Sequence, residues 1–242
     1  MIVINNKYKK LISEINLLFE KSSNSIHKAR NEIKIISYED LELVVKSFKV
    51  PNFINKLIYT FFRDSKAKKS YDNSVKIKEF VPNPVGYIEF KKYGLFHKSY
   101  FVSENFKYDF TIREPLLIDK YKNKDDIFKK FAQFTYDLHE KGIFHEDYSP
   151  GNILIKEEDG NYIFKIVDIN RMQFKKLTLN ERLINFSKLW AKDEDLSVIV
   201  QEYARLISGD ETRCVELALK YSQNHKNKKN LKKRLKGKEV VD

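Results

Sequence analysis

The chain has 242 residues, 42% of them hydrophobic and 14% aromatic, which excludes a disordered chain and allows one large domain or two lobes around a cleft. Its single cysteine, Cys214, excludes an internal disulfide, and no Cys/His cluster has the spacing of a zinc site. No signal-peptide core opens the sequence, and the most apolar stretch, Leu57–Phe62, is far shorter than the ~20 residues of a spanning helix. We therefore expect a soluble cytoplasmic protein.

The net charge of +12 is unevenly distributed. Residues 226–242 contain eight Lys/Arg and two Asp/Glu, so half of the net charge lies in this short stretch. Such a block is typical of a solvated or disordered tail. It also fits adhesion to an anionic surface, either inner-leaflet lipid or nucleic acid. We expect lipid and treat nucleic acid as the less favoured partner.

The first hundred residues are predicted to be rich in strands. Apolar residues at helical spacing predict a helix over residues 7–20, and a polar, turn-like segment follows at 22–31. Further elements follow in order: strands over 32–38 and 41–48, helices over 52–63 and 65–79, and a strand pair over 85–90 and 99–103 that turns near Gly94.

Helices dominate the remainder of the chain. After a connecting segment at 104–115, the clearest helix covers 125–141, with acids in its first turn and Gly142 as its stop signal. A hairpin is predicted within 153–169, and residues 180–223 are mainly helical. A strand-rich region followed by a helical one indicates an α+β architecture with a cleft between two lobes.

The segment from residue 145 to 154 carries the strongest functional signal. It contains the pattern H-x-D-x4-N through His145, Asp147 and Asn152, and a hydrophobic strand ending in Asp168 follows. This order of helix, loop and strand end is that of kinase catalytic and metal-binding loops. By itself the loop could also be a turn rich in Asp, Ser, Pro, Gly and Asn before a hairpin. The flanking elements favour the kinase interpretation.

Phosphoryl transfer explains why these residue types stand at this spacing. The reaction requires positioning and charge neutralisation more than covalent help. We expect Asp147 to accept the proton of the acceptor hydroxyl. Asn152 and Asp168 are expected to hold Mg²⁺, which prefers oxygen ligands and water. His145 is expected to brace the loop by hydrogen bonds, and the predicted cofactors are ATP and Mg²⁺.

Lys46 lies near the end of an apolar strand, as does the lysine of the V-A-I-K strand that reaches the α- and β-phosphates in kinases. Without the downstream motif, it would be interpreted as an edge-strand lysine that faces water. Kinases pair this lysine with an acid on the next helix. The helix over 65–79 offers Asp72 and Glu79, and we prefer Asp72.

The loop that would cover the phosphates departs from the kinase pattern. Residues Asn24–Asn31, at the position of the glycine-rich loop, contain no glycine. Backbone amides can then approach a phosphate less freely. We expect Lys28 or Arg30 to neutralise phosphate charge instead; the alternative is a basic surface turn.

Residues 145–154 together with Asp168 resemble the lipopolysaccharide kinase family, whose members phosphorylate heptose or 3-deoxy-D-manno-octulosonic acid (Kdo) in the inner core. The resemblance runs from about residue 24 to about residue 205. Three further stretches are similar to the Kdo-kinase-like branch of the family: Val44–Phe48, Arg63–Ala67 and Pro82-x-Pro84.

The resemblance implies a protein-kinase-like, two-lobed α+β fold. The expected parts are an N-terminal helical extension (1–23), a small β-rich N-lobe (24–104), a mainly helical C-lobe (105–225) and a basic tail (226–242). It implies that Lys46 contacts the ATP phosphates and that Glu104 lies at the hinge that reads adenine. Family members act on a lipid-linked sugar at the cytoplasmic face of the inner membrane. This implies peripheral attachment there, which the basic tail fits.

Two departures argue against a protein kinase regulated through its activation loop. Glu146 stands where protein kinases usually have Arg, and Asp168-Ile169-Asn170 replaces D-F-G with no A-P-E after it. The predicted function is an ATP-dependent kinase of a Kdo or heptose hydroxyl in the lipopolysaccharide inner core. The alternatives are a kinase of another small-molecule hydroxyl or an atypical protein kinase. A pseudokinase or basic scaffold that binds nucleic acid with a steep salt dependence is less favoured.

Overall fold

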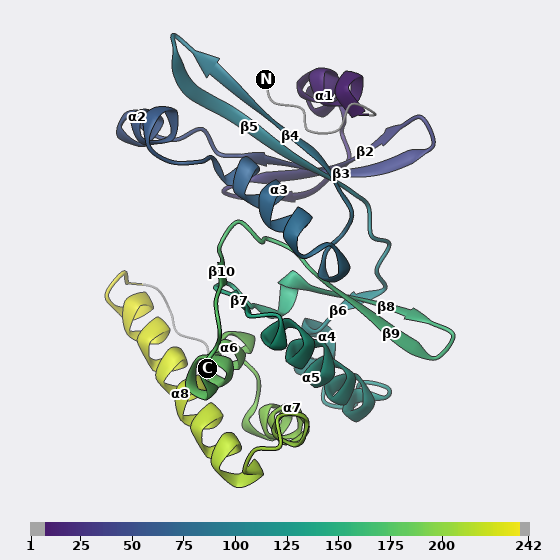
Figure 1. Ribbon diagram of the computed structural model, residues 1–242, viewed down its shortest axis with the longest axis vertical. Coiled ribbons are helices and arrows are strands. Elements are labelled where there is room, and N and C mark those ends of the chain that lie inside the picture. The colour runs from purple at the N-terminus through teal and green to yellow at the C-terminus, as the bar shows by residue number, and fades with distance from the viewer. Residues whose placement is uncertain (1–7, 238–242) are drawn as a thin grey trace. The chain divides into compact units, whose positions relative to one another are not determined.

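The computed structural model describes residues 8–237 (Figure 1). The chain divides into two compact units: unit 1 comprises residues 1–107 and 168–170, and unit 2 comprises 108–167 and 171–242. The division falls three residues after the expected lobe boundary at residue 104, and a short segment beginning at Asp168 belongs to unit 1.

An antiparallel sheet in the order β1-β2-β3-β5-β4 forms the centre of unit 1. The predicted strands are confirmed as β2 to β5, whereas β1 occupies a segment predicted as a turn. All four residues of β1 are exposed, so no alternation of apolar and polar residues marks it as a strand. The strands are β1 (Ser25–Lys28), β2 (Glu32–Tyr38), β3 (Leu41–Phe48), β4 (Pro84–Lys92) and β5 (Leu95–Glu104).

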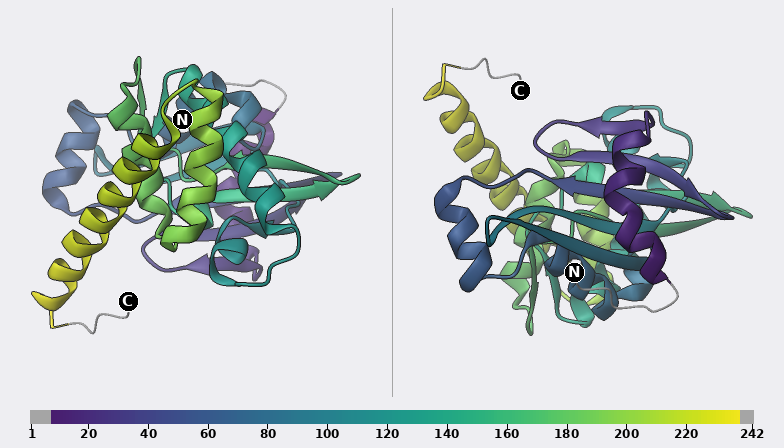
Figure 2. Two further views of the ribbon diagram at one scale, coloured as in Figure 1. Left: turned by 90° about the horizontal axis from the view of Figure 1, so that it is seen from below. Right: turned by 90° about the horizontal axis from the view of Figure 1, so that it is seen from above.

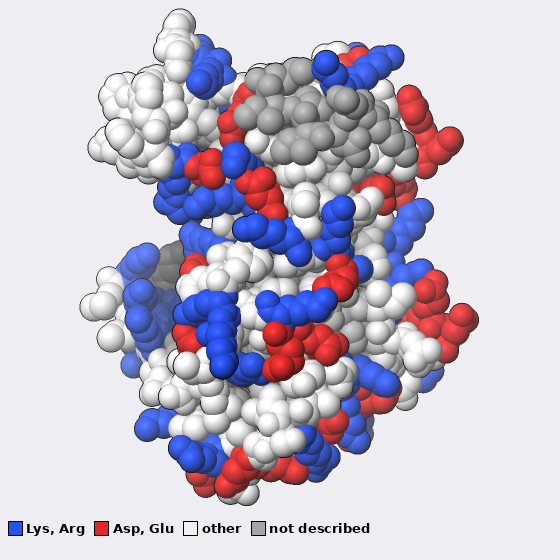
Figure 3. All heavy atoms as spheres, in the orientation of Figure 1, with Lys and Arg blue, Asp and Glu red and all other residues white. Residues whose placement is uncertain are grey.

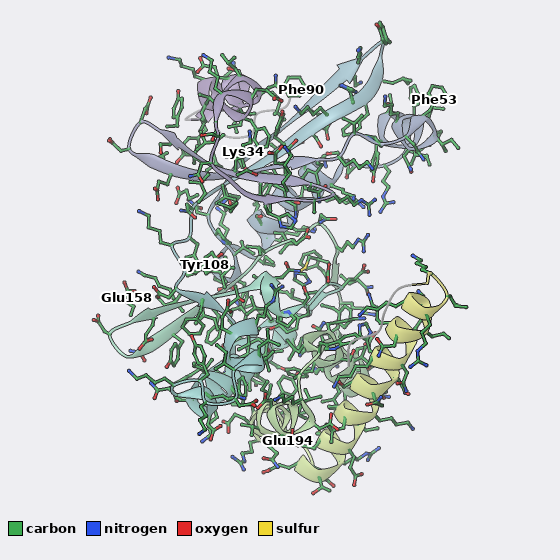
Figure 4. The ribbon with its side chains drawn as sticks, turned by 180° about the vertical axis from the view of Figure 1, so that it is seen from behind. Lys34, Phe53, Phe90, Tyr108, Glu158 and Glu194 are labelled. Carbon is green, nitrogen blue, oxygen red and sulfur yellow. The ribbon has the colours of Figure 1, made fainter. Side chains whose placement is uncertain are left out.

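Helix α1 (Lys9–Lys21) lies across one face of this sheet (Figure 2). Its buried face, which includes Ile12 and Ile15, joins the main apolar core of unit 1. The helix approaches β4 so closely that a Cβ atom added to Gly86 would lie 2.9 Å from the Cδ1 atom of Ile12. The ammonium of Lys34, labelled in Figure 4, donates to two carbonyls at the end of α1, at 2.8 and 2.7 Å. The predicted helix is confirmed, but it belongs to the core of unit 1 rather than extending from it.

The other face of the sheet carries α3 (Lys66–Lys76), and α2 (Phe53–Phe61) packs against β5. Tyr71 of α3 contacts Tyr87 of β4, with ring centroids 5.6 Å apart. Both helices begin at a residue whose side chain accepts a backbone N–H, Asn52 before α2 and Ser65 before α3. The two predicted helices are confirmed, and a short turn η2 (Lys78–Phe80) follows the second.

Unit 2 is mainly helical, and its described residues also form a hairpin and three short strands. The predicted long helix and the hairpin are confirmed, and Asp159 and Gly160 take positive φ at the hairpin turn. Gly142 ends the long helix at φ +68°, where a Cβ atom would lie 2.6 Å from the carbonyl oxygen of Lys175. The elements are β6 (Phe110–Thr111), α4 (Arg113–Leu117), α5 (Lys124–Glu140), β7 (Ile143–His145), η3 (Pro150–Asn152), β8 (Ile153–Glu158), β9 (Asn161–Ile166), β10 (Met172–Phe174), α6 (Leu179–Phe186), η4 (Ser187–Leu189), α7 (Asp193–Leu206) and α8 (Glu211–Arg234).

The basic stretch expected as a tail from residue 226 begins inside α8, which runs from Glu211 to Arg234. Within the described residues, the ammonium of Lys226 donates to the carbonyl of Ala191 at 2.8 Å, and that of Lys233 lies 5.7 Å from the Trp190 ring centroid. The expectation of a disordered tail is therefore wrong for residues 226–234, because lysine has good helix propensity and these contacts hold the helix. Most side chains of this stretch are exposed, as expected for a solvated one. The last five residues of the chain lie outside the described part.

Candidate active site

Lys46 and Asp168 form an ion pair in unit 1, although 122 residues separate them in the sequence. The Lys46 Nζ atom lies 2.7 Å from Asp168 Oδ1, and the side chain of Lys46 is only 12% exposed. The register of β3 places Lys46 between Ile33 of β2 and Phe101 of β5. Lys46 is therefore a largely buried cation on a central strand, not the edge-strand lysine of the alternative interpretation.

The segment that begins with Asp168 is held by side chains of unit 1. Asp168 has φ +57°, a left-handed conformation that few side chains adopt. Asn170 donates to its Oδ1 at 2.6 Å, and Asn73 of α3 donates to the carbonyl of Ile169 at 2.7 Å. The sequence does not identify Asn73, because nothing about an amide on a polar helix indicates that it binds Ile169, far along the chain.

The expected pairing of Lys46 with Asp72 is not the one that the structure forms. Asp72 accepts from Lys68, one turn earlier on α3, at 2.8 Å. Lys68 also lies 3.2 Å from Asp64. A carboxylate four residues after a lysine on the same helix is already within its reach, whereas Asp72 would have to span the distance to β3. The carboxylate that pairs with Lys46 is Asp168.

The other predicted nucleotide-binding residues lie at two places in unit 1. Lys28 ends β1, its ammonium 3.9 Å from Glu32, and Arg30 is exposed in the turn between β1 and β2. Glu104 ends β5, where it donates its backbone N–H to the carbonyl of Asn83 and accepts from the Asn83 side chain. Glu104 lies three residues before the end of the first chain segment of unit 1, and its role at an adenine-reading hinge stays a prediction.

In unit 2, His145 braces the loop that carries Asp147, as predicted. The Nδ1 atom of His145 accepts the backbone N–H of Asp147 at 3.0 Å. Its Nε2 atom lies 3.0 Å from the carbonyl oxygen of Val167 and must donate to it. The two contacts fix a neutral imidazole with its proton on Nε2.

A chain of buried hydrogen bonds supports the loop from behind. Asn185 of α6 donates to the carbonyl of His145 at 2.8 Å and accepts from His139 Nε2 at 3.1 Å. The Nδ1 atom of His139 accepts from the hydroxyl of Tyr203 at 2.8 Å. Burial lowers the pKa of His139 to about 4, so this imidazole is also neutral. These hydrogen bonds could not be predicted from the sequence, because the three residues come from three different helices.

Asn152 is oriented by the same loop. Its side-chain nitrogen donates to the carbonyl of Asp147 at 2.9 Å, which directs the side-chain oxygen away from that contact. An oriented amide oxygen is a suitable ligand for a hard cation such as Mg²⁺, and so is the carboxylate of Asp168. Each residue, Asn152 in unit 2 and Asp168 in unit 1, thus offers by itself the kind of oxygen ligand that Mg²⁺ prefers.

Glu146 has a structural partner in place of a phosphorylated activation loop. Its carboxylate accepts from Gln173 of β10 at 2.8 Å, and its backbone N–H donates to the carbonyl of Arg171 at 3.2 Å. These contacts join β10 to the loop after β7 within unit 2. The residues that follow the 168–170 segment are thus held by unmodified side chains and backbone groups.

A β-rich unit with a buried lysine paired to an acid, and a helical unit with a braced Asp/Asn loop, define a protein-kinase-like phosphotransferase. Residues 76–209, more than half of the chain, match the model of the lipopolysaccharide kinase (Kdo/WaaP) family. The chain belongs to this family. The match does not include Lys46, whose assignment depends on the geometry described above.

One solved structure supports this fold, and a second match is weaker. A structure described as WaaP in complex with acyl carrier protein is similar over 93% of this chain and 99% of that chain, with a TM-score of 0.60 and 12% sequence identity. A MAP kinase from Leishmania major is similar over 88% of this chain and 64% of that chain, with a TM-score of 0.47 and 17% identity. The comparison with curated proteins gave no match.

Proposed function

We propose that this protein transfers the γ-phosphoryl group of ATP to a sugar hydroxyl, of Kdo or heptose, in the lipopolysaccharide inner core. The observation that carries the proposal is the Lys46–Asp168 ion pair. The two residues were assigned to the phosphates and to the metal from separate motifs, and they meet at 2.7 Å. Family membership supports the class of reaction, and this pair supports an intact nucleotide site.

Each side chain has a defined task in the proposed reaction. Lys46 neutralises the non-transferred phosphates, and Asn152 and Asp168 would hold Mg²⁺, which would supply further neutralisation of phosphate charge. Asp147 accepts the proton as the acceptor oxygen forms a bond to the γ-phosphorus. The bond from that phosphorus to the β–γ bridging oxygen breaks, and ADP leaves.

Positive charge near Asp147 supports an acceptor that is itself anionic. The ammonium of Lys188 lies 3.4 Å from His225 on α8. Burial and the charges of Lys229 and Lys228 lower the pKa of Lys188, whereas Asp147 opposes this shift, so these groups lie near one another. A carboxylate-bearing sugar such as Kdo fits this charge better than a neutral one.

Lys188→Gln should raise the acceptor KM several-fold with little change in kcat; an unchanged KM would remove this support.

The basic residues of α8 also support a peripheral location at the cytoplasmic face of the inner membrane, where the protein would meet a lipid-linked acceptor. Among the described residues, no helix combines the length and the apolar composition needed to cross a bilayer. The related WaaP structure contains acyl carrier protein, which makes that protein a candidate partner to test here.

The direct test is transfer of radiolabelled γ-phosphate from ATP, with Mg²⁺, to Kdo–lipid A. We expect Asp147→Asn to lower turnover by roughly 10²–10⁴-fold while nucleotide binding persists, since this is the usual contribution of a general base. Asp159→Asn is the matched control, because this exposed residue lies at a hairpin turn with φ +51° that Asn also tolerates. Wild-type turnover in Asp147→Asn would remove Asp147 as the base. Absence of transfer by the wild type, with ATP bound, would direct the search to other acceptors or to a pseudokinase role.

A further inference from the structure

Helix α2 turns its apolar stripe to solvent. At 3.6 residues per turn, Phe53, Ile54, Leu57, Ile58 and Phe61 fall within a stripe about 140° wide. The exposed fractions are 66% for Phe53, 67% for Ile54 and 67% for Phe61, and Phe62, just after the helix, is 85% exposed. Amphipathic helices in soluble domains normally bury this stripe. The space-filling view shows the result as a white patch over α2 (Figure 3), and Figure 4 labels Phe53 at the start of the helix.

The opposite side of α2 fixes this orientation. The hydroxyl of Thr60 accepts the backbone N–H of Phe96 in β5 at 2.8 Å. The ring of Tyr59 lies against that of Phe96, with centroids 5.4 Å apart. Asn52 caps the first turn by accepting the N–H of Asn55. The helix is therefore anchored to the sheet through its less apolar side, and the outward stripe is a stable feature of unit 1.

Basic and aromatic residues border the stripe. Tyr93, at the tip of the hairpin between β4 and β5, is 92% exposed, and its neighbour Lys92 is exposed beside it. Burial lowers the pKa of His97, and the charges of Lys56 and Lys92 lower it further, so both ammonium groups lie near this end of the hairpin. Arg63 is exposed at the other end of α2.

The acid that follows Arg63 in the sequence adds little negative charge to this border. Asp64 follows Arg63, but its carboxylate lies 3.2 Å from the ammonium of Lys68. The surface defined by Phe53, Ile54, Phe61, Phe62 and Tyr93 is thus apolar, convex and rimmed by positive charge; we call it the α2 surface.

We propose that the α2 surface inserts into the headgroup layer of an anionic phospholipid membrane. A short helix with aromatic and aliphatic side chains on one side and basic residues at the border is the pattern of an interfacial helix. Lysine and arginine can extend their charged ends toward lipid phosphates while aromatic rings lie at the depth of the headgroups. A second copy of the chain would bring two positive rims together, which disfavours self-association through this surface.

The proposal locates the membrane contact on unit 1, in addition to any contribution from the basic residues of α8. It rests on the proposed function in one respect: an acceptor embedded in a bilayer is the reason why the protein would need a membrane contact. Binding to lipid can be measured without any phosphoryl transfer, so the two ideas fail separately.

The test is co-flotation of the full chain with vesicles of phosphatidylethanolamine and phosphatidylglycerol. The variant Phe53→Gln/Phe61→Gln/Phe62→Gln removes three apolar side chains and keeps helix propensity. The matched control is Leu117→Gln/Ile118→Gln, which removes two side chains of unit 2, away from α8, that are 70% and 50% exposed. We expect the α2 variant to bind at least ~10-fold more weakly, the control to bind as the wild type does, and vesicles without phosphatidylglycerol to bind the wild type weakly.

Activity separates this result from misfolding and from failure of the proposed function. The α2 variant should phosphorylate a deacylated, soluble acceptor at the wild-type rate and lose transfer to the same sugar in vesicles. Wild-type flotation by the α2 variant would overturn the proposal. Two other results would also overturn it, provided that the α2 variant still binds vesicles as the wild type does. One is that the wild type forms a dimer and the variant does not. The other is that the variant loses binding to purified acyl carrier protein. If no acceptor is phosphorylated by the wild type, flotation alone still decides the role of α2.

Discussion

At the scale of single residues, Asp168 combines a strained backbone with two side-chain hydrogen bonds. Its φ of +57° is tolerated by Asp and Asn more readily than by most residues, and its Oδ1 atom accepts from both Lys46 and Asn170. Such strain persists where the surrounding structure determines the conformation, and it is common at functional sites. Here the two hydrogen bonds fix the position of the carboxylate.

Asp168→Asn isolates the charge of this residue, because Asn also adopts positive φ. We expect a loss of at least ~10-fold in Mg²⁺-dependent ATP affinity, since a hydrogen bond to a charged group contributes about 1.5–3 kcal/mol. The measurement is titration with ATP in Mg²⁺ and again in EDTA. Asp72→Asn is the matched control, because Asp72 pairs with Lys68. The ATP affinity of this variant should equal that of the wild type. A loss in Asp72→Asn as large as in Asp168→Asn would restore Asp72 to the nucleotide site.

His139 makes stability depend on pH. The unfolded imidazole binds a proton near its ordinary pKa of 6.5, whereas the buried one does so only near pH 4. Between these two pKa values the unfolded state binds more protons than the folded state. His139 therefore lowers the free energy of unfolding by up to ~3 kcal/mol as the pH falls from 6.5 to 4. Above pH 6.5 it has no such effect. His139→Gln should flatten this slope in urea titrations, and the exposed His27→Gln should not. Equal slopes in all three proteins would contradict the assignment.

At the scale of elements, α1 and α8 both differ from the extensions that the sequence suggested. The stripe of α1 that includes Ile12, Ile15 and Phe19 is buried against the sheet, and Lys34 ties the helix end to β2. Helix α8 continues through the basic stretch and contacts η4 along its course. Both helices therefore contribute to the stability of their own unit.

Ile15→Ala tests whether α1 is part of the core of unit 1. Ile15 is fully buried, so its truncation should cost about 2–4 kcal/mol of unfolding free energy, as is usual for buried Ile→Ala. Leu17→Ala on the same helix, 54% exposed, should cost less than ~0.5 kcal/mol. Urea denaturation followed by far-ultraviolet circular dichroism gives both values. Equal, small costs would mean that α1 is dispensable.

At the scale of the whole molecule, the residues that we propose to act on ATP are divided between the units. Lys46 and Asp168 belong to unit 1, and Asp147 and Asn152 to unit 2. The proposed reaction requires all four to act on one ATP. A ligand that binds only the native state stabilises the parts that it contacts.

Hydrogen exchange with and without Mg·ATP tests this requirement. We expect slower exchange both in β3 around Lys46 and in the loop from Asp147 to Asn152, with neither change in Asp168→Asn. Protection confined to unit 1 would indicate that the helical unit takes no part in binding ATP. The same experiment on Asp159→Asn should reproduce the wild-type pattern.

The sequence by itself determined the strands β2 to β5, the long helix α5, the kinase-like loop and the bracing role of His145. These features are local: apolar periodicity, a glycine stop and fixed spacing within ten residues encode them. The sequence could not reveal β1, which is exposed on both faces, or the continuation of α8 through a charged stretch.

Only the tertiary structure decided which acid pairs with Lys46, which amide holds Ile169, and how Tyr203, His139 and Asn185 support the loop. It also decided that the apolar stripe of α2 faces outward, although its periodicity alone predicts a buried face. The physical reason is the same in each case. A hydrogen bond or an ion pair depends on the distance between atoms that the fold brings together, and sequence spacing carries no information about that distance once the residues lie on different elements.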